Sequence, residues 1–503
     1  MALLLGYDAG SSSIKATLMD AQTGSVLASA TSPQKELEII AKKPGWAEQN
    51  PSVWWDNIKS ATRQIKDKAK FDAGDIKGIG ISYQMHGLVA VDRNQNVLRP
   101  AIIWCDSRAV QIGQQAAKDI GEKKCLKRLL NLPGNFTASK LKWVKDNEPD
   151  VYSKIYKIMV PGDYIAMKMS GRINTTPSGL SEGIMWDFEK EKLADFVLDD
   201  YGISPELTAE PLPAFSIHGE LSTKAADELG LRAGTKITYK GGDQPNNALS
   251  LGALEPGDIA VTAGTSGVVC GISDKRDYDK LSRVNTFVHV NHLPKKPRYA
   301  VLLCINGAGI LNSWLRHNFA GDSEGDLGYE QMNDFASKVP VGSDGLLVFP
   351  YGNGAERVFE NKNMGASVRG WNFNTHKKAH FFRAAQEGVV FALNYGLGIM
   401  HNIGVSVRTA RAGNANMFLS PLFAEAFATV SGAVVKLYNT DGSQGAARGA
   451  GIGAGVYKDY NDAFVGLDCK KVIEPNKNLE SVYRGAYENW LTILQSQVNS
   501  ADS

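Results

Sequence analysis

The sequence lacks the features that would tie it to a membrane or to a nucleic acid. No uninterrupted apolar stretch approaches the ~18 residues that a membrane helix needs. Neither sign of charge dominates, because 55 Lys and Arg residues stand against 53 Asp and Glu residues and the formal net charge is +2. A chain with this balance has neither the basic surface of a nucleic-acid-binding protein nor an acidic tail. We therefore expect no nucleic acid and no membrane among its partners.

Cysteine is also scarce, with 5 residues in a chain of 503. The number is odd, and no two cysteines have the spacing of a metal site or a redox motif, so a reducing compartment is the simpler interpretation. The stretch from Met1 to Leu5 lacks the basic segment of a signal peptide, and Asp8 interrupts its apolar run. These observations predict a cytoplasmic protein.

Several common catalytic motifs are missing as well. The sequence contains no Walker A motif, no His-Glu-x-x-His and no Gly-x-Ser-x-Gly. The run from Gly449 to Gly455 is rich in glycine, but it lacks the spacing of a dinucleotide-binding fingerprint and no predicted strand directly precedes it. We therefore interpret this run as a helix that packs closely against its neighbours.

The length of the chain and two similar turns predict two domains. A single core rarely grows beyond ~250–300 residues. An apolar strand pattern leads into Ala9-Gly10-Ser11-Ser12, and another leads into Ala263-Gly264-Thr265-Ser266 about half a chain later. This repetition favours a duplicated architecture. Strand and helix patterns alternate, so we predict an α/β protein with an N-terminal domain over 1–253 and a C-terminal domain over 254–503.

Further patterns predict individual elements. Asn50-Pro51 is a helix start, with asparagine as the cap and proline in the first turn. The long apolar segment 381–400 is typical of a buried helix. Strands are expected at 14–19, 76–82, 88–92, 101–104, 258–263, 268–272 and 345–351.

The two turns have the composition of phosphate-binding hairpins. Small residues let a phosphate approach the backbone N–H groups, and hydroxyls add further donors. Asp8 ends the strand before the first turn, where a carboxylate can hold Mg²⁺ through water. A plain hairpin is the alternative for either turn alone, but the pair favours two hairpins that grip a triphosphate.

Asp243 is the candidate general base. It follows Gly241 and Gly242, where the backbone is permissive and space is open, so that it could accept a proton from a substrate hydroxyl. A simple Gly-Gly-Asp turn is the alternative.

Polar groups that suit a sugar lie between predicted strands. Gln84 and His86 can form hydrogen bonds with sugar hydroxyls, and Met85 can cover an apolar edge. Trp104 ends the neighbouring strand. The alternatives are a loop with a satisfied histidine and a core tryptophan beside a helix cap at Asp106. The small residues from Gly413 to Asn416 suit a flat adenine ring, although a helix cap explains them equally well.

Together these residues resemble the FGGY carbohydrate kinases, and among them the xylulokinases, over nearly the whole chain. Each segment alone is a weak signal, but their common order is a strong one. The resemblance is carried by Tyr7 to Lys15, Gly45 to Pro51, Gln84 to Gly87, Trp104 to Arg108, Lys140 to Trp143, Gly241 to Asp243, Gly264 to Ser266 and Gly413 to Asn416.

The resemblance implies two actin-like ATPase domains of the ribonuclease H-like type, with the site in a cleft between them, and ATP and Mg²⁺ as cofactors. It implies Asp8 near the metal and Asp243 as the base. The implied substrate-binding residues are Gln84, Met85, His86, Trp104, Asp243 and Gln244. The implied nucleotide-binding residues are Gly10, Ser11, Ser12, Gly264, Thr265, Gly309, Gly413 and Asn416.

The sequence departs from this family pattern in a few places. Gln244 follows the base where xylulokinases commonly have asparagine and glycerol kinases have glutamine. Asn135 opens the stretch around Lys140, which is unusual. Trp371 and Gln386 replace typical aliphatic residues, and we expect these last differences to affect packing.

We therefore predict an ATP-dependent sugar kinase that converts D-xylulose to D-xylulose 5-phosphate. Another ketose, a polyol, glycerol or gluconate is the alternative substrate, although glycerol kinases carry Arg-Glu where Met85-His86 stand. An actin-like nucleotide-binding module without phosphoryl transfer is the rival from another class, and Asp243 argues against it. The sequence does not give the oligomeric state, for which a homodimer is one candidate.

Overall fold

The chain divides into two compact units in a computed structural model that describes residues 1–319 and 327–500. The first unit comprises 1–252, 287–299 and 440–467. The second comprises 253–286, 300–439 and 468–503, of which the structure describes all but 320–326 and 501–503. The chain first passes from one unit to the other between residues 252 and 253, and two later segments join the first unit.

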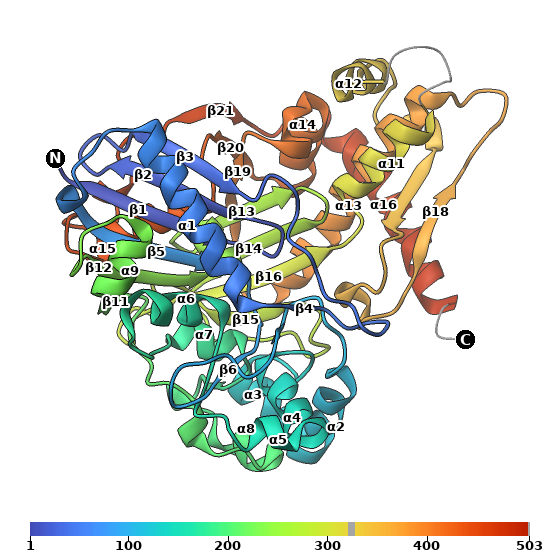
Figure 1. The fold of residues 1–503 in the computed structure, drawn as a ribbon. Coiled ribbons are helices and arrows are strands. Elements are labelled where there is room, and N and C mark those ends of the chain that lie inside the picture. The colour runs from blue at the N-terminus through green and yellow to red at the C-terminus, as the bar shows by residue number, and fades with distance from the viewer. Residues whose placement is uncertain (320–326, 501–503) are drawn as a thin grey trace. The chain divides into compact units, whose positions relative to one another are not determined.

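A six-stranded sheet forms the centre of the first unit (Figure 1). The central strand β1 runs antiparallel to β2 and parallel to β5. The strand order is β11 (Phe215–Glu220), β12 (Lys236–Gly242), β5 (Ile76–Tyr83), β1 (Leu3–Ala9), β2 (Ile14–Asp20) and β3 (Val26–Ser32).

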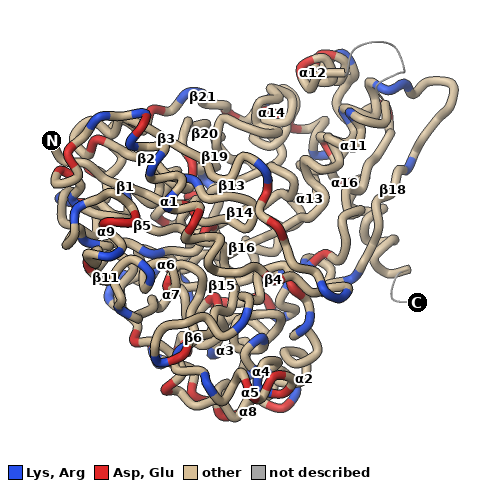
Figure 2. The backbone as a smooth tube through the Cα atoms, in the orientation of Figure 1, with Lys and Arg blue, Asp and Glu red and all other residues tan. Residues whose placement is uncertain are grey.

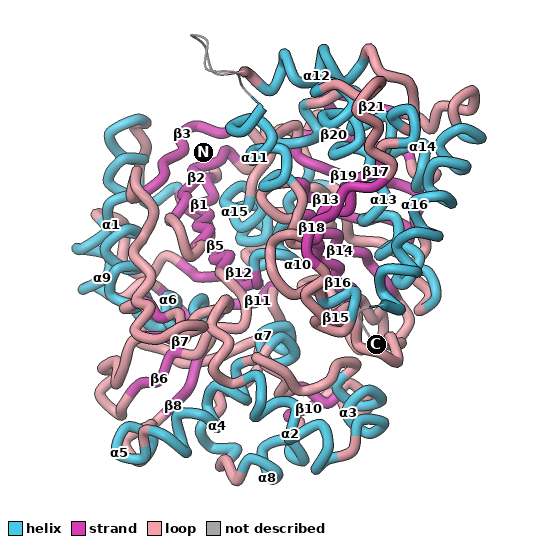
Figure 3. The backbone as a smooth tube through the Cα atoms, turned by 90° about the vertical axis from the view of Figure 1, so that its right-hand side faces the viewer, coloured by secondary structure: helices cyan, strands magenta, loops and turns pink. Residues whose placement is uncertain are grey.

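Helix α1 (Pro51–Lys68) covers one face of this sheet (Figure 3). It begins as predicted, because the Asn50 side chain accepts a hydrogen bond from the Ser52 N–H and Pro51 occupies the first turn. Its apolar side, which includes Trp54 and Ile58, is buried in the core of the unit.

Helix α15 (Gly442–Gly453) packs on β1, β5 and β12 at the other face. The contact is too close for larger side chains: a Cβ atom on Gly80 of β5 would lie 1.9 Å from the Ala446 carbonyl oxygen. A Cβ atom on Gly6 of β1 would lie 2.0 Å from the Ser443 carbonyl oxygen. In the glycine-rich run itself, a Cβ atom on Gly453 would lie 1.8 Å from the Thr238 carbonyl oxygen, and one on Gly449 would lie 2.6 Å from Cγ of Tyr239. Close helix packing therefore explains these glycines, as predicted.

The rest of the first unit consists of short helices and small sheets. Strand β6 (Val89–Val91) pairs with β8 (Lys157–Met159), and β4 (Glu48–Gln49) pairs with β7 (Ala101–Ile102). The helices are α2 (Val110–Ile120), α3 (Glu122–Leu129), α4 (Thr137–Asn147), α5 (Pro149–Tyr152), α6 (Pro161–Ser170), α7 (Pro177–Glu182), α8 (Asp195–Tyr201), α9 (Thr223–Leu229) and α10 (Asp243–Ser250).

The second unit is built around a seven-stranded sheet. Its hairpin of β13 and β14 is antiparallel, and β13 runs parallel to β19, as β1 runs to β5 in the first unit. The strand order is β15 (Asn285–Val288), β16 (Tyr299–Ile305), β14 (Gly267–Ser273), β13 (Gly257–Ala263), β19 (Val407–Gly413), β20 (Val434–Tyr438) and β21 (Cys469–Ile473). The predicted repetition of a strand–turn–strand start is confirmed.

Helices and a further β-hairpin complete the second unit. The predicted buried helix 381–400 lies within α13, and the predicted strand 345–351 begins two residues later, at Leu347. These elements are α11 (Gly309–Phe319), α12 (Tyr329–Ser337), α13 (Lys378–Asn402), α14 (Pro421–Ser431), α16 (Glu480–Ser500), β17 (Leu347–Tyr351) and β18 (Gly365–Arg369). The α/β fold class is thus confirmed.

The charged residues of both signs are mixed in the structure. Acidic and basic residues are interspersed along the backbone of each unit (Figure 2). Within 1–319 and 327–500, none of the helices has the length and apolar character required to cross a membrane.

Candidate active site

The first predicted phosphate hairpin joins β1 to β2. Its turn is closed by a hydrogen bond of 3.1 Å from the Gly10 N–H to the Ser13 carbonyl oxygen. Asp8 stands opposite Lys15 in the register of the two strands. The turn therefore begins within two residues of Asp8 in the chain.

The Asp8 carboxylate faces the N-terminus of helix α15. It accepts a hydrogen bond of 2.7 Å from the Ser82 hydroxyl, and a Cβ atom on Gly442 would lie 2.3 Å from its Oδ2 atom. Burial raises the pKa of Asp8, while the Ser82 hydrogen bond and Lys15 oppose that change and Asp441 adds to it. The N-terminal end of a helix favours negative charge, so the start of α15 suits both the Asp8 carboxylate and a phosphate group.

Asp243 is the first residue of helix α10, directly after β12. Burial raises its pKa to about 7, with a further contribution from the charge of Asp8, whereas the backbone N–H groups of Gln244 and Asp243 lower it. A general base is most effective with a pKa near the working pH. The charges of Asp243 and Asp8 therefore interact within the first unit. Gln244 follows Asp243 in the first turn of α10.

The predicted sugar-binding loop (residues 84–87), called the sugar loop below, follows β5 and holds His86 in an uncommon backbone conformation, with φ of +62°. The His86 N–H donates to Glu182 Oε1 over 3.4 Å, and His86 Nδ1 lies 2.9 Å from the Glu182 carbonyl oxygen. A carbonyl oxygen only accepts, so Nδ1 carries the proton in this bond. The rings of Phe136 and Phe287 pack against the imidazole, with centroids 5.0 and 5.4 Å away.

Met85 and Glu182 bring the sugar loop close to Asp243, the predicted base. A Cβ atom on Gly242 would lie 2.7 Å from Met85 Cγ and 2.6 Å from Glu182 Oε2. Only glycine therefore fits directly before Asp243. Glu182 is fully buried, and burial followed by the charge of Asp243 raises its pKa well above the usual range.

Trp104 connects the predicted sugar residues to the phosphate hairpin. It is 53% exposed, so it is not the core residue that the alternative interpretation required, and its Nε1–H donates to the Ser11 hydroxyl over 3.2 Å. Gln84 is buried and donates to Gln49 Oε1, while Gln49 Nε2 donates to the Ser11 carbonyl oxygen over 2.7 Å. Gln49 thus links Gln84 to the hairpin between β1 and β2 by hydrogen bonds.

The second unit contains a cavity of about 480 Å³ beside the second predicted hairpin. The hairpin is fixed to the start of α11, because the Gly309 N–H donates to the Gly264 carbonyl oxygen over 2.7 Å. The cavity contains four of the predicted nucleotide-binding residues. Its lining is Ala263, Gly264, Thr265, Gly309, Ile310, Asn312, Ser313, Tyr329, Asn333, Gln386, Asn416, Met417, Leu419 and Ser420.

Three other predicted features of the second unit fall differently. Gly413 ends β19 and is absent from the cavity lining, although a Cβ atom there would meet open space. Gln386 lines the cavity and forms hydrogen bonds with Ser420 and Asn333. Its departure from the family pattern therefore touches the cavity as well as packing. Trp371 is 53% exposed and packs edge-on against the ring of Phe381, with centroids 4.9 Å apart.

Sequence reasoning missed the residues that support the sugar loop. Glu182 ends helix α7 in the stretch Pro177–Glu182, whose pattern has no catalytic signature. Phe287 is more than 100 positions from His86 in the sequence and joins the first unit only through the segment 287–299. Lys140 stood in a recognised family segment, but no role followed from its sequence context.

The parts of a phosphotransferase are present in this chain. One α/β unit carries a buried carboxylate with a pKa near 7 beside a polar loop, and the other carries a nucleotide-sized cavity beside a hairpin of small residues. Family models identify the class more closely. The FGGY family of carbohydrate kinases matches with its N-terminal domain over 3–250 and its C-terminal domain over 259–456. The chain belongs to the FGGY family of carbohydrate kinases.

Individual relatives agree with this assignment. A xylulose kinase of Bacillus subtilis (strain 168) is 29% identical, over 92% of this chain and 90% of its own. The crystal structure of xylulose kinase from Rhodospirillum rubrum superposes with a TM-score of 0.89 at 24% identity, and the match covers 100% of both chains. A gluconate kinase from Lactobacillus acidophilus has the same fold, with a TM-score of 0.89 at 22% identity over 100% of this chain and 99% of its own.

Proposed function

We propose that this ATP-dependent sugar kinase phosphorylates D-xylulose and forms D-xylulose 5-phosphate. The observation that carries the proposal is the contact between the base and the sugar loop: Gly242, directly before Asp243, meets Met85 and Glu182, and Glu182 in turn holds His86. A base beside groups that recognise hydroxyls can select one hydroxyl and deprotonate it. The similarity to xylulose kinases, one of them 29% identical over 92% of this chain, favours this ketose.

In the proposed reaction, Asp243 accepts the proton of the attacking hydroxyl while His86, Met85 and Trp104 hold the sugar. Gln84 and Gln244 support the same pocket. The oxygen of that hydroxyl forms a bond to the γ-phosphorus, and the bond between the γ-phosphorus and the bridging oxygen of ADP breaks. The proton resides on Asp243 until it is released to solvent.

We assign the nucleotide to both hairpins and to the cavity of the second unit. Gly10, Ser11 and Ser12, together with Gly264 and Thr265, offer backbone N–H groups and hydroxyls to the phosphates. We place Gly309, Gly413 and Asn416 around the adenine ring and the ribose of the nucleotide. A cavity of about 480 Å³ lies within the range of ~300–1,000 Å³ that is usual for such ligands.

Mg²⁺ fits the donor set around Asp8. In phosphotransferases this ion is commonly held by one or two carboxylates and the substrate phosphates, and it neutralises charge on the transferring group. The described residues contain no cluster of three or more His, Cys, Asp or Glu side chains that could hold a metal alone. We therefore propose that Asp8 holds the ion together with the nucleotide.

Gluconate is the second candidate substrate. A gluconate kinase shares the fold with a TM-score of 0.89, and Gln244 is longer than the asparagine that is common in xylulokinases. The longer amide would shorten the pocket or shift the sugar within it.

We also propose a cytoplasmic location, where ATP and a reducing environment for the five free cysteines are both present.

Light scattering on the purified protein would test whether the chain forms the homodimer named above as one candidate for its oligomeric state.

Specificity constants for D-xylulose, D-ribulose, L-xylulose, glycerol and gluconate test the substrate. We expect D-xylulose to give the highest kcat/KM, and His86→Ala to flatten the preference with less effect on the KM for ATP. A pocket built to bind a hydroxyl can reject an analogue that lacks it by ~10⁴-fold, because its polar groups are left unpaired. A tenfold higher constant for any of the other four compounds would refute D-xylulose and leave the kinase assignment intact.

A further inference from the structure

Two loops with predicted sugar-binding residues meet at one buried ammonium group. Lys140 lies on helix α4 and is fully buried. Its Nζ atom donates to the His86 carbonyl oxygen over 2.8 Å and to the Ile103 carbonyl oxygen over 2.9 Å. His86 belongs to the sugar loop, and Ile103 begins the Trp104 loop (residues 103–108). A single side chain therefore joins the two loops.

The position of the His86 carbonyl depends on a backbone conformation that needs support. A non-glycine residue with a positive φ is uncommon, and His86 has a φ of +62°. Its peptide groups are held from two directions, by Glu182 at the N–H and by Lys140 at the carbonyl oxygen. This conformation sets the direction of the imidazole, which packs against the rings of Phe136 and Phe287.

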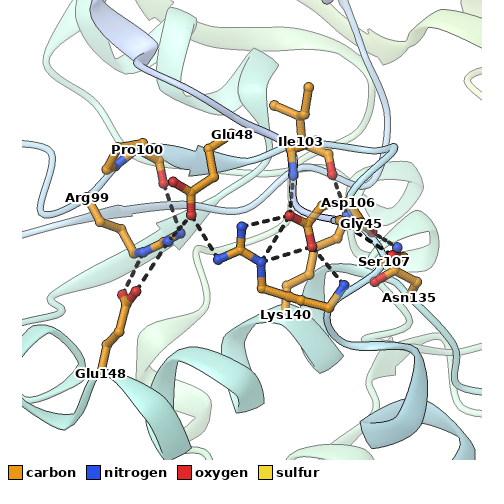
Figure 4. Close-up of polar contacts among 12 residues, drawn as sticks. Gly45, Glu48, Arg99, Pro100, Ile103, Asp106, Ser107, Asn135, Lys140 and Glu148 are labelled. Atoms are coloured by element: carbon orange, nitrogen blue, oxygen red, sulfur yellow. Dashed lines mark hydrogen bonds and ion pairs between the residues drawn. The ribbon is translucent and has the colours of Figure 1, made fainter. Parts of the chain in front are cut away.

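The Trp104 loop is held on its other side by a chain of alternating charges (Figure 4). Asp106 is fully buried, accepts from the Ala47 N–H over 2.6 Å and pairs with Arg108 over 2.7 Å. Arg108 also pairs with Glu48 over 2.8 Å. The chain continues from Glu48 through Arg99 to Glu148, which is partly exposed. This network fixes the Trp104 loop, and Lys140 fixes the sugar loop to it.

We propose that Lys140 is a positioning residue, which holds the sugar loop and the Trp104 loop at the spacing that the substrate requires. Lys140 touches neither substrate nor nucleotide in this account, and it acts through the two carbonyl groups that it binds. The inference rests on the proposed placement of the sugar at His86 and Trp104. It adds a specificity-determining residue outside the pocket itself.

Lys140→Met tests this role, because methionine fills similar space and cannot donate. Misplacing binding groups by about 1 Å can reduce the rate about 10²-fold. We therefore expect kcat/KM for the sugar to fall by about 10–100-fold, with the KM for ATP within about twofold of wild type. Lys142→Met is the matched control: Lys142 lies on the same helix, pairs with Asp146 over 2.6 Å and is partly exposed. The control should keep the wild-type constants.

A purely structural role would give a different result. A general loss of folding would lower the melting temperature and impair ATP and sugar alike. Retention of kcat/KM for the sugar within threefold of wild type, or an equal loss for ATP, would overturn the proposal. If wild type turned over no sugar in the panel, the proposed function would fail first, and the two failures are thus distinguishable.

A second measurement compares wild type with the conservative variant Lys140→Arg and decides the matter if Lys140→Met does not fold. Burial lowers the pKa of Lys140 to about 7, although Asp106, Cys105 and Glu182 oppose this change and Arg108 adds to it. Hydrogen bonds from a charged donor are roughly twice as strong as those from a neutral one. The Kd of wild type for the sugar should therefore rise between pH 7 and pH 9, and Lys140→Arg should abolish the rise. The same pH dependence of Kd in wild type and in Lys140→Arg would overturn the proposal.

Discussion

At the scale of single residues, Asp243 combines burial with a position at the start of a helix. Burial raises its pKa to about 7, and backbone N–H groups limit that rise. Asp243→Ala removes the proposed base, and positioned bases contribute ~10²–10⁴-fold to the rate. We expect kcat to fall by at least about a hundredfold while ATP and sugar still bind, as measured by calorimetry. A variant that retains more than about a tenth of the wild-type kcat would refute the assignment.

Asp8 is predicted to hold Mg²⁺ at the β- and γ-phosphates. Asp8→Asn keeps an acceptor for the Ser82 hydroxyl, which now donates to Asp8 over 2.7 Å, but removes the negative charge. The Mg²⁺ concentration for half-maximal activity should rise and kcat should fall more than sugar affinity does, because the ion stabilises charge during transfer. A Mg²⁺ titration of both proteins measures this, and coincident curves would count against the role.

The sequence contains motifs that predict roles for these residues, but it contains none for the residues that support them. Asp8, Asp243 and His86 stand in short motifs whose residue types indicate their chemistry. Glu182 and Phe287 lack such motifs, because their contribution arises from tertiary contacts with His86. A buried carboxyl group that accepts a hydrogen bond from a distant backbone N–H leaves no local pattern in the sequence.

At the scale of elements, the face of α15 that meets β1 and β5 depends on glycine. A Cβ atom on Gly80 would lie 1.9 Å from a backbone oxygen of the helix, and neither backbone can move freely. Gly80→Ala should therefore destabilise the protein by about 1–3 kcal/mol, the usual cost of overpacking. Urea denaturation followed by fluorescence measures the change.

The control for this prediction is Gly398→Ala in α13, where a Cβ atom meets nothing within 4 Å. Replacing a helix-interior glycine with alanine typically stabilises by about 0.5–1 kcal/mol. Equal effects of the two substitutions would show that close packing of α15 is not the cause.

Element prediction succeeded where a residue acts locally. The Asn50 cap and Pro51 act within one turn of α1, so their pattern located its start. The strand predicted over 101–104 is shorter, since β7 ends at Ile102 and the chain turns at Trp104. Trp104, which follows this strand, is exposed at the surface of the first unit. An apolar sequence pattern does not distinguish an exposed tryptophan from a buried one.

At the scale of the whole molecule, the first unit is discontinuous in sequence. Its sheet is covered on one face by α15, which comes from the segment 440–467. A pattern of strands and helices gives their order along the chain but not which sheet a late helix covers. A single division of the chain at residue 253 therefore does not describe the first unit, which also contains 287–299 and 440–467.

The fragment 1–252 tests this organisation, since it lacks α15 and leaves the glycine face of the sheet uncovered. We expect it to lose cooperative unfolding and to expose apolar surface, in contrast to the full chain. Thermal unfolding and binding of a hydrophobic dye measure the two effects. A fragment with a sharp transition and no dye binding would show that α15 is dispensable.

The most direct test of the central claim is the identity of the product. We predict that the enzyme with Mg²⁺, ATP and D-xylulose forms one ADP for each D-xylulose 5-phosphate, observed by phosphorus NMR, and that Asp243→Ala forms neither at a comparable rate. ATP consumption that does not depend on any sugar, with inorganic phosphate as the sole phosphorus product besides ADP, would contradict the account.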